Sequence, residues 1–365
     1  MLLLSFPLHR RHLIATARWG AALLGLTISG AVLIAARPAA AQADFYKGKT
    51  VEIIISTGVT GGLDANARVV ARHLGNHLPG HPTIVPKNMP GGGHIRAANY
   101  VFGQAPKDGT TIGTFIPIFV TAQVLDRSSG IHFDAAEFQW LISTSSSNST
   151  VYAWHTAPVN SLEDAMKREV VLGGTGVGSY TVIYPTVMNS VIGTKFKLVT
   201  GYQGTGDIAL AMQRGEVEGR AGNNFNSLKA ESPDWLPTGK IRLLAQVGLE
   251  RDPEHPTVPL LLDFARNDED RQILRLFSSD VVIGRPFAVP PGVPAERVAL
   301  LRKAFEEMMR DPAYIEEANR SGLDLSPVSG ERVQQLITEL VHSPPAIVAK
   351  AKLAMEPKGM VERGK

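Results

Sequence analysis

The most constraining feature of this chain is a repeated unit: an apolar run, a glycine-rich loop and then a helix-like segment. The unit occurs twice between residues 51 and 100, where the loops read G-V-T-G-G (58–62) and N-M-P-G-G-G (88–93). Largely β-branched runs such as V-E-I-I-I (51–55) are typical of strands buried on both faces of a parallel sheet. In open α/β sheets, ligands bind in loops at the carboxyl ends of the strands. This stretch therefore predicts an α/β unit with one ligand site.

The two loops favour an anionic ligand. Glycine allows backbone N–H groups to approach a bound group without a Cβ in the way, and the N-terminus of the following helix attracts negative charge. The expected ligand therefore carries a carboxylate or a phosphate. Asp64 stands where the first helix begins, and we interpret it as a helix cap or loop-ordering residue rather than as a general base.

The middle third of the chain repeats this plan. Strand-like runs at 170–173 and 195–199 precede glycine-rich loops at 173–179 and 201–207, and helical segments follow both loops. A polar Ser/Thr/Asn stretch at 144–150 and a second segment at 278–285 are predicted to be crossovers. We therefore predict an α/β fold of two lobes, each a mixed sheet flanked by helices, with a ligand cleft between them. The predicted boundaries are 44–148 plus 282–365 for the first lobe and 149–281 for the second.

The first 43 residues are typical of a secretory signal peptide. Three arginines within residues 10–18 precede an apolar run at 21–36, and A-Q-A at 41–43 matches a small-residue cleavage site. The apolar run is shorter than the roughly 20 residues that span a bilayer. The context of the arginine pair at 10–11 matches a twin-arginine signal poorly. We expect cleavage after Ala43, export by the Sec route and a periplasmic location.

Charge and cysteine content exclude several classes of function. The predicted leader holds four arginines and no acidic residue, so its removal changes the formal net charge from +3 to −1. No basic face for nucleic acid is implied. The chain has no cysteine, which excludes disulfides and thiol chemistry.

The sequence does not favour a catalytic or metal-binding motif. The glycine loops do not match the dinucleotide fingerprint, and there is no G-x-S-x-G or H-E-x-x-H. Ser179 is the most nucleophile-like serine, but no histidine is near it in sequence, so helix capping or a ligand hydrogen bond is favoured. The spacing of His73, His77 and His81 could hold a metal, but without a nearby acidic or thiol partner a solvated helix end is favoured. We predict no catalysis, no cofactor and no metal.

Several segments resemble the periplasmic substrate-binding receptors of tripartite tricarboxylate transporters, also called Bug-type receptors. The most specific part is the asparagine-proline-glycine loop at 88–93, followed by the Asp-Gly-Thr turn in P-K-D-G-T-T-I-G (106–113). The resemblance begins at G-G-L-D-A-N-A-R (61–68) and continues through G-T-G-V-G-S (174–179) to P-P-G-V-P-A-E-R-V (290–298). It therefore covers essentially the whole chain after the leader.

The resemblance implies a type II periplasmic binding protein that closes on a small organic carboxylate. Its partners would be the membrane permease subunits of a tripartite tricarboxylate-type transporter, and the receptor would be a monomer. In this family, the first loop and the facing loops of the second lobe hold the carboxylate through backbone N–H groups and water. The predicted ligand-binding residues come from these loops and from the ends of a strand and a crossover: Gly58, Thr60, Gly61, Gly62, Asp64, Asn88, Gly91, Thr175, Gly178, Ser179, Tyr202, Gly204, Asp207, Asn223 and Arg285.

Departures from the family pattern concern the ligand more than the fold. The first loop usually carries two prolines, but here it reads T-G-V-T (57–60), and His94 replaces a glycine. Asp207 replaces a common proline and adds a negative charge, which could disfavour a dianion or contact a cationic group. Gly284-Arg285 stands where an aromatic pair is common, and either Arg220 or Arg285 could pair with a carboxylate.

Two alternatives to a transport receptor stay open from the sequence. A ligand sensor that docks on a signalling protein would share the fold and differ only in its partner. A periplasmic enzyme acting on a carboxylated substrate would need a nucleophile–base pair in the cleft, and the sequence offers none.

Overall fold

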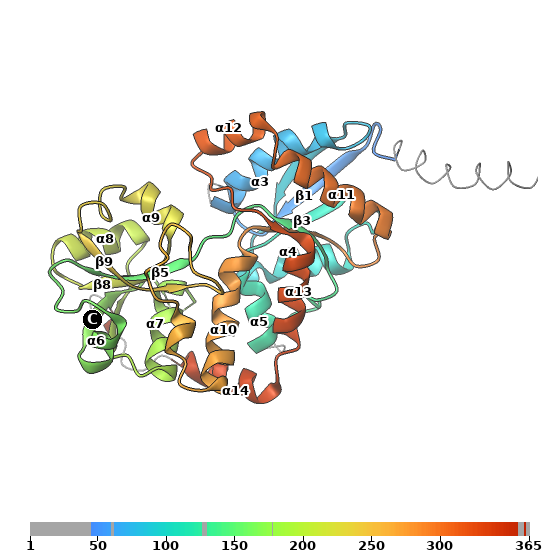
Figure 1. Ribbon diagram of the computed structural model, residues 1–365. Helices are drawn as coiled ribbons and strands as arrows, with labels where there is room; N and C mark the ends of the chain where they lie inside the picture. Colours follow the sequence, from blue (N-terminus) through green and yellow to red (C-terminus); the bar gives the residue numbers. More distant parts are fainter. Residues whose placement is uncertain (1–44, 60–61, 126–129, 177, 357–360, 363–365) are drawn as a thin grey trace, which may run out of the picture.

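The computed structural model describes residues 45–59, 62–125, 130–176, 178–356 and 361–362. The predicted signal peptide lies outside the described residues. Two lobes stand side by side, with the second lobe in green and yellow and the first in blue, orange and red (Figure 1). Among the described helices, none combines the length and apolar character that a membrane span requires.

The first lobe is built on a mixed six-stranded sheet. β1 pairs in parallel with β2 and β3, whereas β10 pairs antiparallel with β3 and β4. β1 forms as predicted because Ile53, Ile54 and Ile55 are all buried. In spatial order the strands are β11 (Val328–Ser329), β4 (Gln139–Ser143), β10 (Pro286–Val289), β3 (Thr111–Thr114), β1 (Thr50–Ile55) and β2 (Thr83–Asn88).

The second lobe has a mixed six-stranded sheet of its own. β6 pairs in parallel with β7 and β8, and β5 pairs antiparallel with β8 and β9. In spatial order the strands are β12 (Val361–Glu362), β7 (Phe196–Thr200), β6 (Val170–Gly173), β8 (Gly219–Asn224), β5 (Ser149–Trp154) and β9 (Ile241–Val247).

Helices flank both sheets, as predicted for an α/β fold. Those of the first lobe are α3 (Gly62–His73), α4 (Ile95–Gly103), α5 (Ile118–Leu125), α11 (Ala295–Met308), α12 (Pro312–Arg320) and α13 (Gly330–Val341). Those of the second lobe are α6 (Leu162–Lys167), α7 (Tyr180–Val191), α8 (Thr205–Gln213) and α9 (Phe225–Glu231). The short 3₁₀ helices are η1 (Leu74–His77), η2 (Gly92–His94) and η3 (Leu261–Phe264).

Two further helices, α10 (Asp268–Ile283) and α14 (Pro345–Ala354), join the lobes at the lower side of Figure 1. Both contact α5 of the first lobe and α7 of the second. Beyond α14 the chain enters the second sheet, where β12 pairs with β7. The predicted boundary, which gave all of 282–365 to the first lobe, is therefore wrong for β12. A two-residue strand carries no periodicity from which its sheet could be predicted.

The two crossovers between the lobes lie against each other. Residues 144–148 lead from β4 to β5, and the amide of Arg285 donates a 3.0 Å hydrogen bond to the carbonyl of Ser145. Gly284 has φ +57°, and a Cβ at this position would lie 1.9 Å from that same carbonyl oxygen, so only glycine fits.

The second crossover is shorter than predicted. Residues 278–283 belong to α10, although the sequence predicted a crossover there. Ser278, Ser279 and Val281 are not strong helix formers, but tertiary burial of this turn outweighs propensity.

Candidate functional site

A cavity of about 360 Å³ lies between the two lobes. This volume falls within the range of roughly 300–1,000 Å³ that is typical of small-molecule sites. The start of α3, both crossovers, α7, α10, the end of β8 and the start of α9 all contribute to its lining. The lining is rich in hydroxyl and amide side chains, and its charged residues are Arg285, Asp280 and Asp324.

Arg285 provides the positive charge of the cavity. Burial lowers the pKa of its guanidinium, and the nearby carboxylate of Asp324 acts in the opposite direction. Its Nη1 is buried without a hydrogen-bond partner. Nη2 lies 3.3 Å from the place that a Cβ on Gly62 would occupy, so glycine at the first position of α3 lets the guanidinium approach the helix N-terminus. An anion here would therefore meet both a cation and the positive end of a helix.

Asp280 is the buried carboxylate of the cavity, with an exposed fraction of 2%. Its oxygens accept hydrogen bonds from Thr121 Oγ1, at 2.9 and 3.0 Å, and from the Tyr180 hydroxyl at 3.1 Å. Burial raises the pKa of this carboxyl from 3.8 to about 6, although both hydrogen bonds oppose the shift. Asp280 is not among the predicted site residues, because the sequence predicts a crossover rather than a helix at this position.

Hydroxyl groups form much of the remaining wall. Ser145 donates a 3.0 Å hydrogen bond to Asp324, whereas Ser147 Oγ and the Tyr184 hydroxyl are buried without a partner. The rings of Tyr180 and Tyr184 stack with centroids 5.1 Å apart. Burial raises the pKa of both tyrosines well above the usual value, so both stay neutral. Unpartnered buried hydroxyls are rare in folded proteins and are consistent with a site that a ligand completes.

The ligand-binding residues predicted in the first lobe do not all line the cavity. Gly62 lines the cavity, Gly58 is exposed in the first loop, and Thr60 and Gly61 lie outside the described residues. Asp64 and Asn88 do not line the cavity. The amide of Asn88 instead donates to Asp64 Oδ1 at 2.8 Å and to the carbonyl of Thr57 at 3.0 Å.

Arg68 completes this network, with Nε 2.9 Å from Oδ2 of Asp64. Asp64 and Asn88 therefore stabilise the first loop through hydrogen bonds.

The second predicted loop of the first lobe is exposed at Gly91, which precedes η2. At its end, His94 adopts φ +79°, a left-handed conformation that glycine enters at little cost. This explains why a glycine suits the position. The His94 ring nitrogen Nδ1 lies 3.2 Å from the carbonyl of Ser56, and burial lowers the pKa of the imidazole.

The predicted contacts of the second lobe do not line the cavity. Ser179 precedes α7, and its hydroxyl donates to the carbonyl of Gly176 at 2.8 Å and lies 2.6 Å from Thr181 Oγ1. The loops that hold Thr175 and Tyr202 pack against each other, since the amide of Gly201 donates to the carbonyl of Thr175.

The other predicted residues of this lobe also lie outside the lining. Gly178 and Asp207 are exposed, and Gly204 precedes α8. Asn223 is buried against Thr150, and its neighbour Asn224 lines the cavity instead. Side chains on successive positions of β8 point to opposite faces, which explains why Asn224 rather than Asn223 lines the cavity.

Arg220 is not part of the interlobe cavity. It is 1% exposed on β8, and its Nη1 donates a 3.1 Å hydrogen bond to the carbonyl of Thr205. Glu231 Oε2 lies 3.6 Å from the same nitrogen. Arg220 lines a separate cavity of about 300 Å³ within the second lobe. Of the two arginines predicted as possible partners of a ligand carboxylate, Arg285 lines the interlobe cavity.

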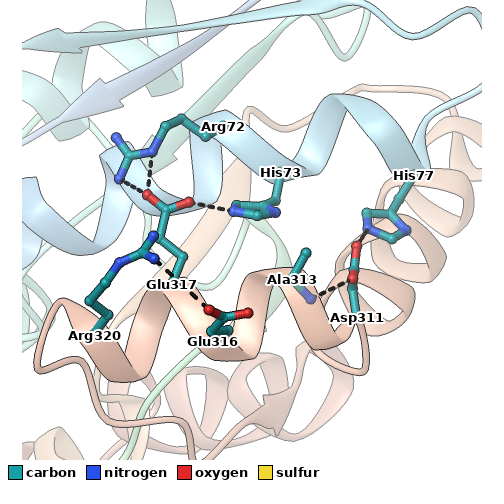
Figure 2. Close-up of polar contacts among 8 residues, drawn as sticks. All are labelled: Arg72, His73, His77, Asp311, Ala313, Glu316, Glu317 and Arg320. Carbon is teal, nitrogen blue, oxygen red and sulfur yellow. Dashed lines mark hydrogen bonds and ion pairs between the residues drawn. The ribbon is translucent and has the colours of Figure 1, made fainter.

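Two of the three histidines considered as metal ligands, His73 and His77, join α3 and η1 to α12 and its N-cap (Figure 2), whereas His81 is exposed. His73 Nε2 lies 2.6 Å from Glu317 Oε2, and His77 Nε2 lies 3.1 Å from Asp311 Oδ2. Arg72 also contacts Glu317, with Nε 2.7 Å from Oε1. These carboxylates are more than 200 positions away, so sequence proximity could not reveal them. Within the described part of the chain, no group of three or more histidine or acidic residues could hold a metal ion.

Comparison with known proteins agrees with this architecture. The profile of the tripartite tricarboxylate transporter family receptor matches residues 66–353. A curated relative, the UPF0065 protein in the gbd 5′ region of Cupriavidus necator, is 25% identical over 359 residues, which cover 95% of this chain and 99% of the relative.

Solved structures share the fold. A TctC solute-binding protein from Polaromonas, without ligand, has a TM-score of 0.65 at 20% identity and covers 85% of this chain and 99% of its own. An R. palustris protein solved with adipate has a TM-score of 0.56 at 20% identity, covering 83% of this chain and 97% of its own. MatC from Rhodopseudomonas palustris with bound malate has a TM-score of 0.55 at 18% identity, covering 84% and 99%.

The predicted fold class, a two-lobed α/β periplasmic binding protein, is confirmed by these likenesses. The profile match covers most of the chain on both sides of the cleft, including α3, α7 and α10. The chain therefore belongs to the receptor family of tripartite tricarboxylate transporters.

Proposed function

We propose that this protein is a periplasmic receptor that captures a small organic carboxylate between its lobes and delivers it to the permease of a tripartite tricarboxylate-type transporter. The observation that carries the proposal is Arg285, whose buried Nη1 has no partner and whose side chain lines the interlobe cavity. The relatives solved with adipate and with malate support a carboxylate as the ligand class.

The physical basis is the free energy of an unsatisfied guanidinium. A buried donor without a partner costs about 1–3 kcal/mol, and more when the group is charged. A carboxylate beside Arg285 would offset this cost through a charge-assisted hydrogen bond, and the N-terminus of α3 at Gly62 would add to the attraction. Closure of the lobes about the two crossovers would then remove the ligand from water.

An enzyme is less well supported by the same cavity. Among its described lining residues there is no histidine, cysteine or lysine. Asp280 could act as a base, but its hydrogen-bond donors are Thr121 and Tyr180, and no lining serine donates to it. The described lining residues therefore do not form the nucleophile–base pair that hydrolytic catalysis requires.

The proposal is tested with the chain from residue 44 onward, screened by thermal shift and calorimetry against monocarboxylates, dicarboxylates and amino acids. We expect at least one carboxylate to raise the melting temperature, because a ligand that binds only the folded state stabilises it by mass action. Arg285→Gln should abolish the shift, and Arg310→Gln, which changes an exposed arginine, should preserve it. Failure of every carboxylate to bind, or an unchanged affinity in Arg285→Gln, would contradict the proposal.

Transport and sensing differ only in the partner. Co-purification of the ligand-loaded receptor with membrane-embedded permease subunits, and not with a signalling protein, is the expected result for a transport receptor.

A further inference from the structure

The charged side chains of the interlobe cavity do not neutralise one another. Arg285 and Asp280 both line it, but they form no ion pair with each other. Within the described part of the chain, the carboxylate of Asp280 accepts hydrogen bonds from the neutral hydroxyls of Thr121 and Tyr180 and forms no ion pair. Each charge is therefore held in a partly desolvated place without an opposite charge in direct contact, and such charges are costly unless they are paired.

Asp324 adds a second negative charge to the lining. Its Oδ2 accepts 3.0 Å hydrogen bonds from the hydroxyls of Ser145 and Ser326, and its negative charge partly opposes the lowering of the Arg285 pKa by burial. One arginine and two aspartates give the lining a formal charge of −1 when both acids are ionised.

The negative formal charge of the lining disfavours a ligand with two negative charges. One carboxylate of a dicarboxylate could meet Arg285, but the other would remain in a cavity that also holds Asp280. Like charges brought together in a buried site cost several kcal/mol. A ligand with a carboxylate at one end and an ammonium at the other would give both Arg285 and Asp280 an opposite charge.

Among the described residues that surround Asp280, no cation pairs with it. Thr121 of α5 and Tyr180 of α7 donate to it, and Tyr184 of α7 lies nearby as a neutral phenol. The charged pairs that α10 makes with α13 and α14 involve Arg275 with Glu339 and Lys350 with Glu269. Each of those cations has its own carboxylate, so Asp280 depends on a ligand for a positive partner.

We propose that the ligand is an amino-carboxylate: a small zwitterion whose carboxylate faces Arg285 and whose ammonium faces Asp280. This inference rests on the proposed function, since it names the ligand class of the same cavity. It assigns Asp280 the role of a specificity-determining residue that selects an amine and rejects a second carboxylate.

The test compares ligands that differ only at one end. Glutarate with 4-aminobutyrate and adipate with 5-aminopentanoate are matched pairs in which a carboxylate is replaced by an ammonium, and common α-amino acids extend the series. Calorimetry at pH 7.5 on the chain from residue 44 should show the amino member of at least one pair binding at least tenfold more tightly. Asp280→Asn should reduce that preference by tenfold or more, because asparagine has nearly the shape of aspartate but carries no charge.

Two further variants keep the result interpretable. Asp268→Asn removes an exposed acid from the first turn of the same helix and should leave the preference unchanged. Tyr180→Phe removes a donor to Asp280 while preserving its charge, so the amine should still be preferred even if affinity falls.

The outcomes separate this inference from the proposed function. Tighter binding of the dicarboxylate in every pair, or an amine preference that survives Asp280→Asn, overturns the inference and leaves the carboxylate receptor intact. Absence of binding by any carboxylate, with or without an amine, overturns both.

Discussion

The hydroxyl of Tyr180 donates a 3.1 Å hydrogen bond to Oδ2 of Asp280, and so joins α7 of the second lobe to α10. Both residues line the interlobe cavity. The shape of the cavity therefore depends on the protonation state of one buried carboxyl group, that of Asp280.

Tyr180→Phe should lower the free energy of unfolding by about 1.5–3 kcal/mol at pH 7.5, the range for a hydrogen bond to a charged group. The loss should be smaller at pH 5, where Asp280 is largely protonated. Urea denaturation at both pH values measures it. Tyr184→Phe is the control: it removes a buried hydroxyl without a partner, so it should be neutral or slightly stabilising.

Asp280→Asn should make the ligand-free protein more stable at neutral pH. The folded-state pKa of about 6 lies above the ordinary 3.8, so the ionised carboxyl disfavours the folded state. This penalty is absent below pH 4, grows as the pH rises from about 4 to about 6, and is complete above that range. The difference between these two pKa values corresponds to roughly 3 kcal/mol of stability, and weaker hydrogen bonds in the variant would reduce this gain. A stability difference between variant and wild type that does not change between pH 4 and pH 7.5 would show that the pKa of Asp280 is not raised.

Gly284→Ala should destabilise the protein by several kcal/mol, because its Cβ would overlap the carbonyl oxygen of Ser145 in the adjacent crossover. Gly215→Ala provides the comparison. Gly215 also has a positive φ, +74°, but a Cβ there would meet no atom within 4 Å, so only the backbone cost of about 1 kcal/mol applies. Equal denaturation midpoints for the two variants would contradict the steric argument.

Ser179→Ala should leave the affinity for the bound carboxylate within about twofold, because the hydroxyl contacts Gly176 and Thr181 rather than the cavity. Calorimetry with the tightest-binding carboxylate measures this. A tenfold loss, with unchanged thermal stability of the free protein, would restore Ser179 as a ligand contact, as the sequence suggested.

The fold was largely predictable because its signals are local. The β-branched run at 51–55 and the glycine loops of both lobes identify strands and turns within a few residues, without knowledge of tertiary contacts. The end of α10 was not predictable in this way: its last turn has weak helix formers, and burial of Ser278 and Asp280 stabilises it.

The cavity was only partly predictable because its residues converge through packing. Arg285 and Gly62 were identified from a crossover end and from a glycine loop. Asp280 and Tyr180 come together only when α10 packs on α7, which no spacing in the sequence encodes. The Ser/Thr/Asn stretch at 144–150 was recognised as a crossover, but its hydroxyls also form part of the cavity wall.

The position of β10 between β3 and β4 has a consequence for the order in which the protein folds. β4 cannot be joined to β3 in the first sheet until β10 has been synthesised as far as residue 289, whereas strands β5 to β9 of the second sheet follow one another in sequence and end at residue 247. Domains usually fold in order from the N-terminus during synthesis. Here the second lobe has strands β5 to β9 available before β10 can join β3 to β4, so the strands of the first lobe that are synthesised first must wait for a strand that follows the whole second lobe.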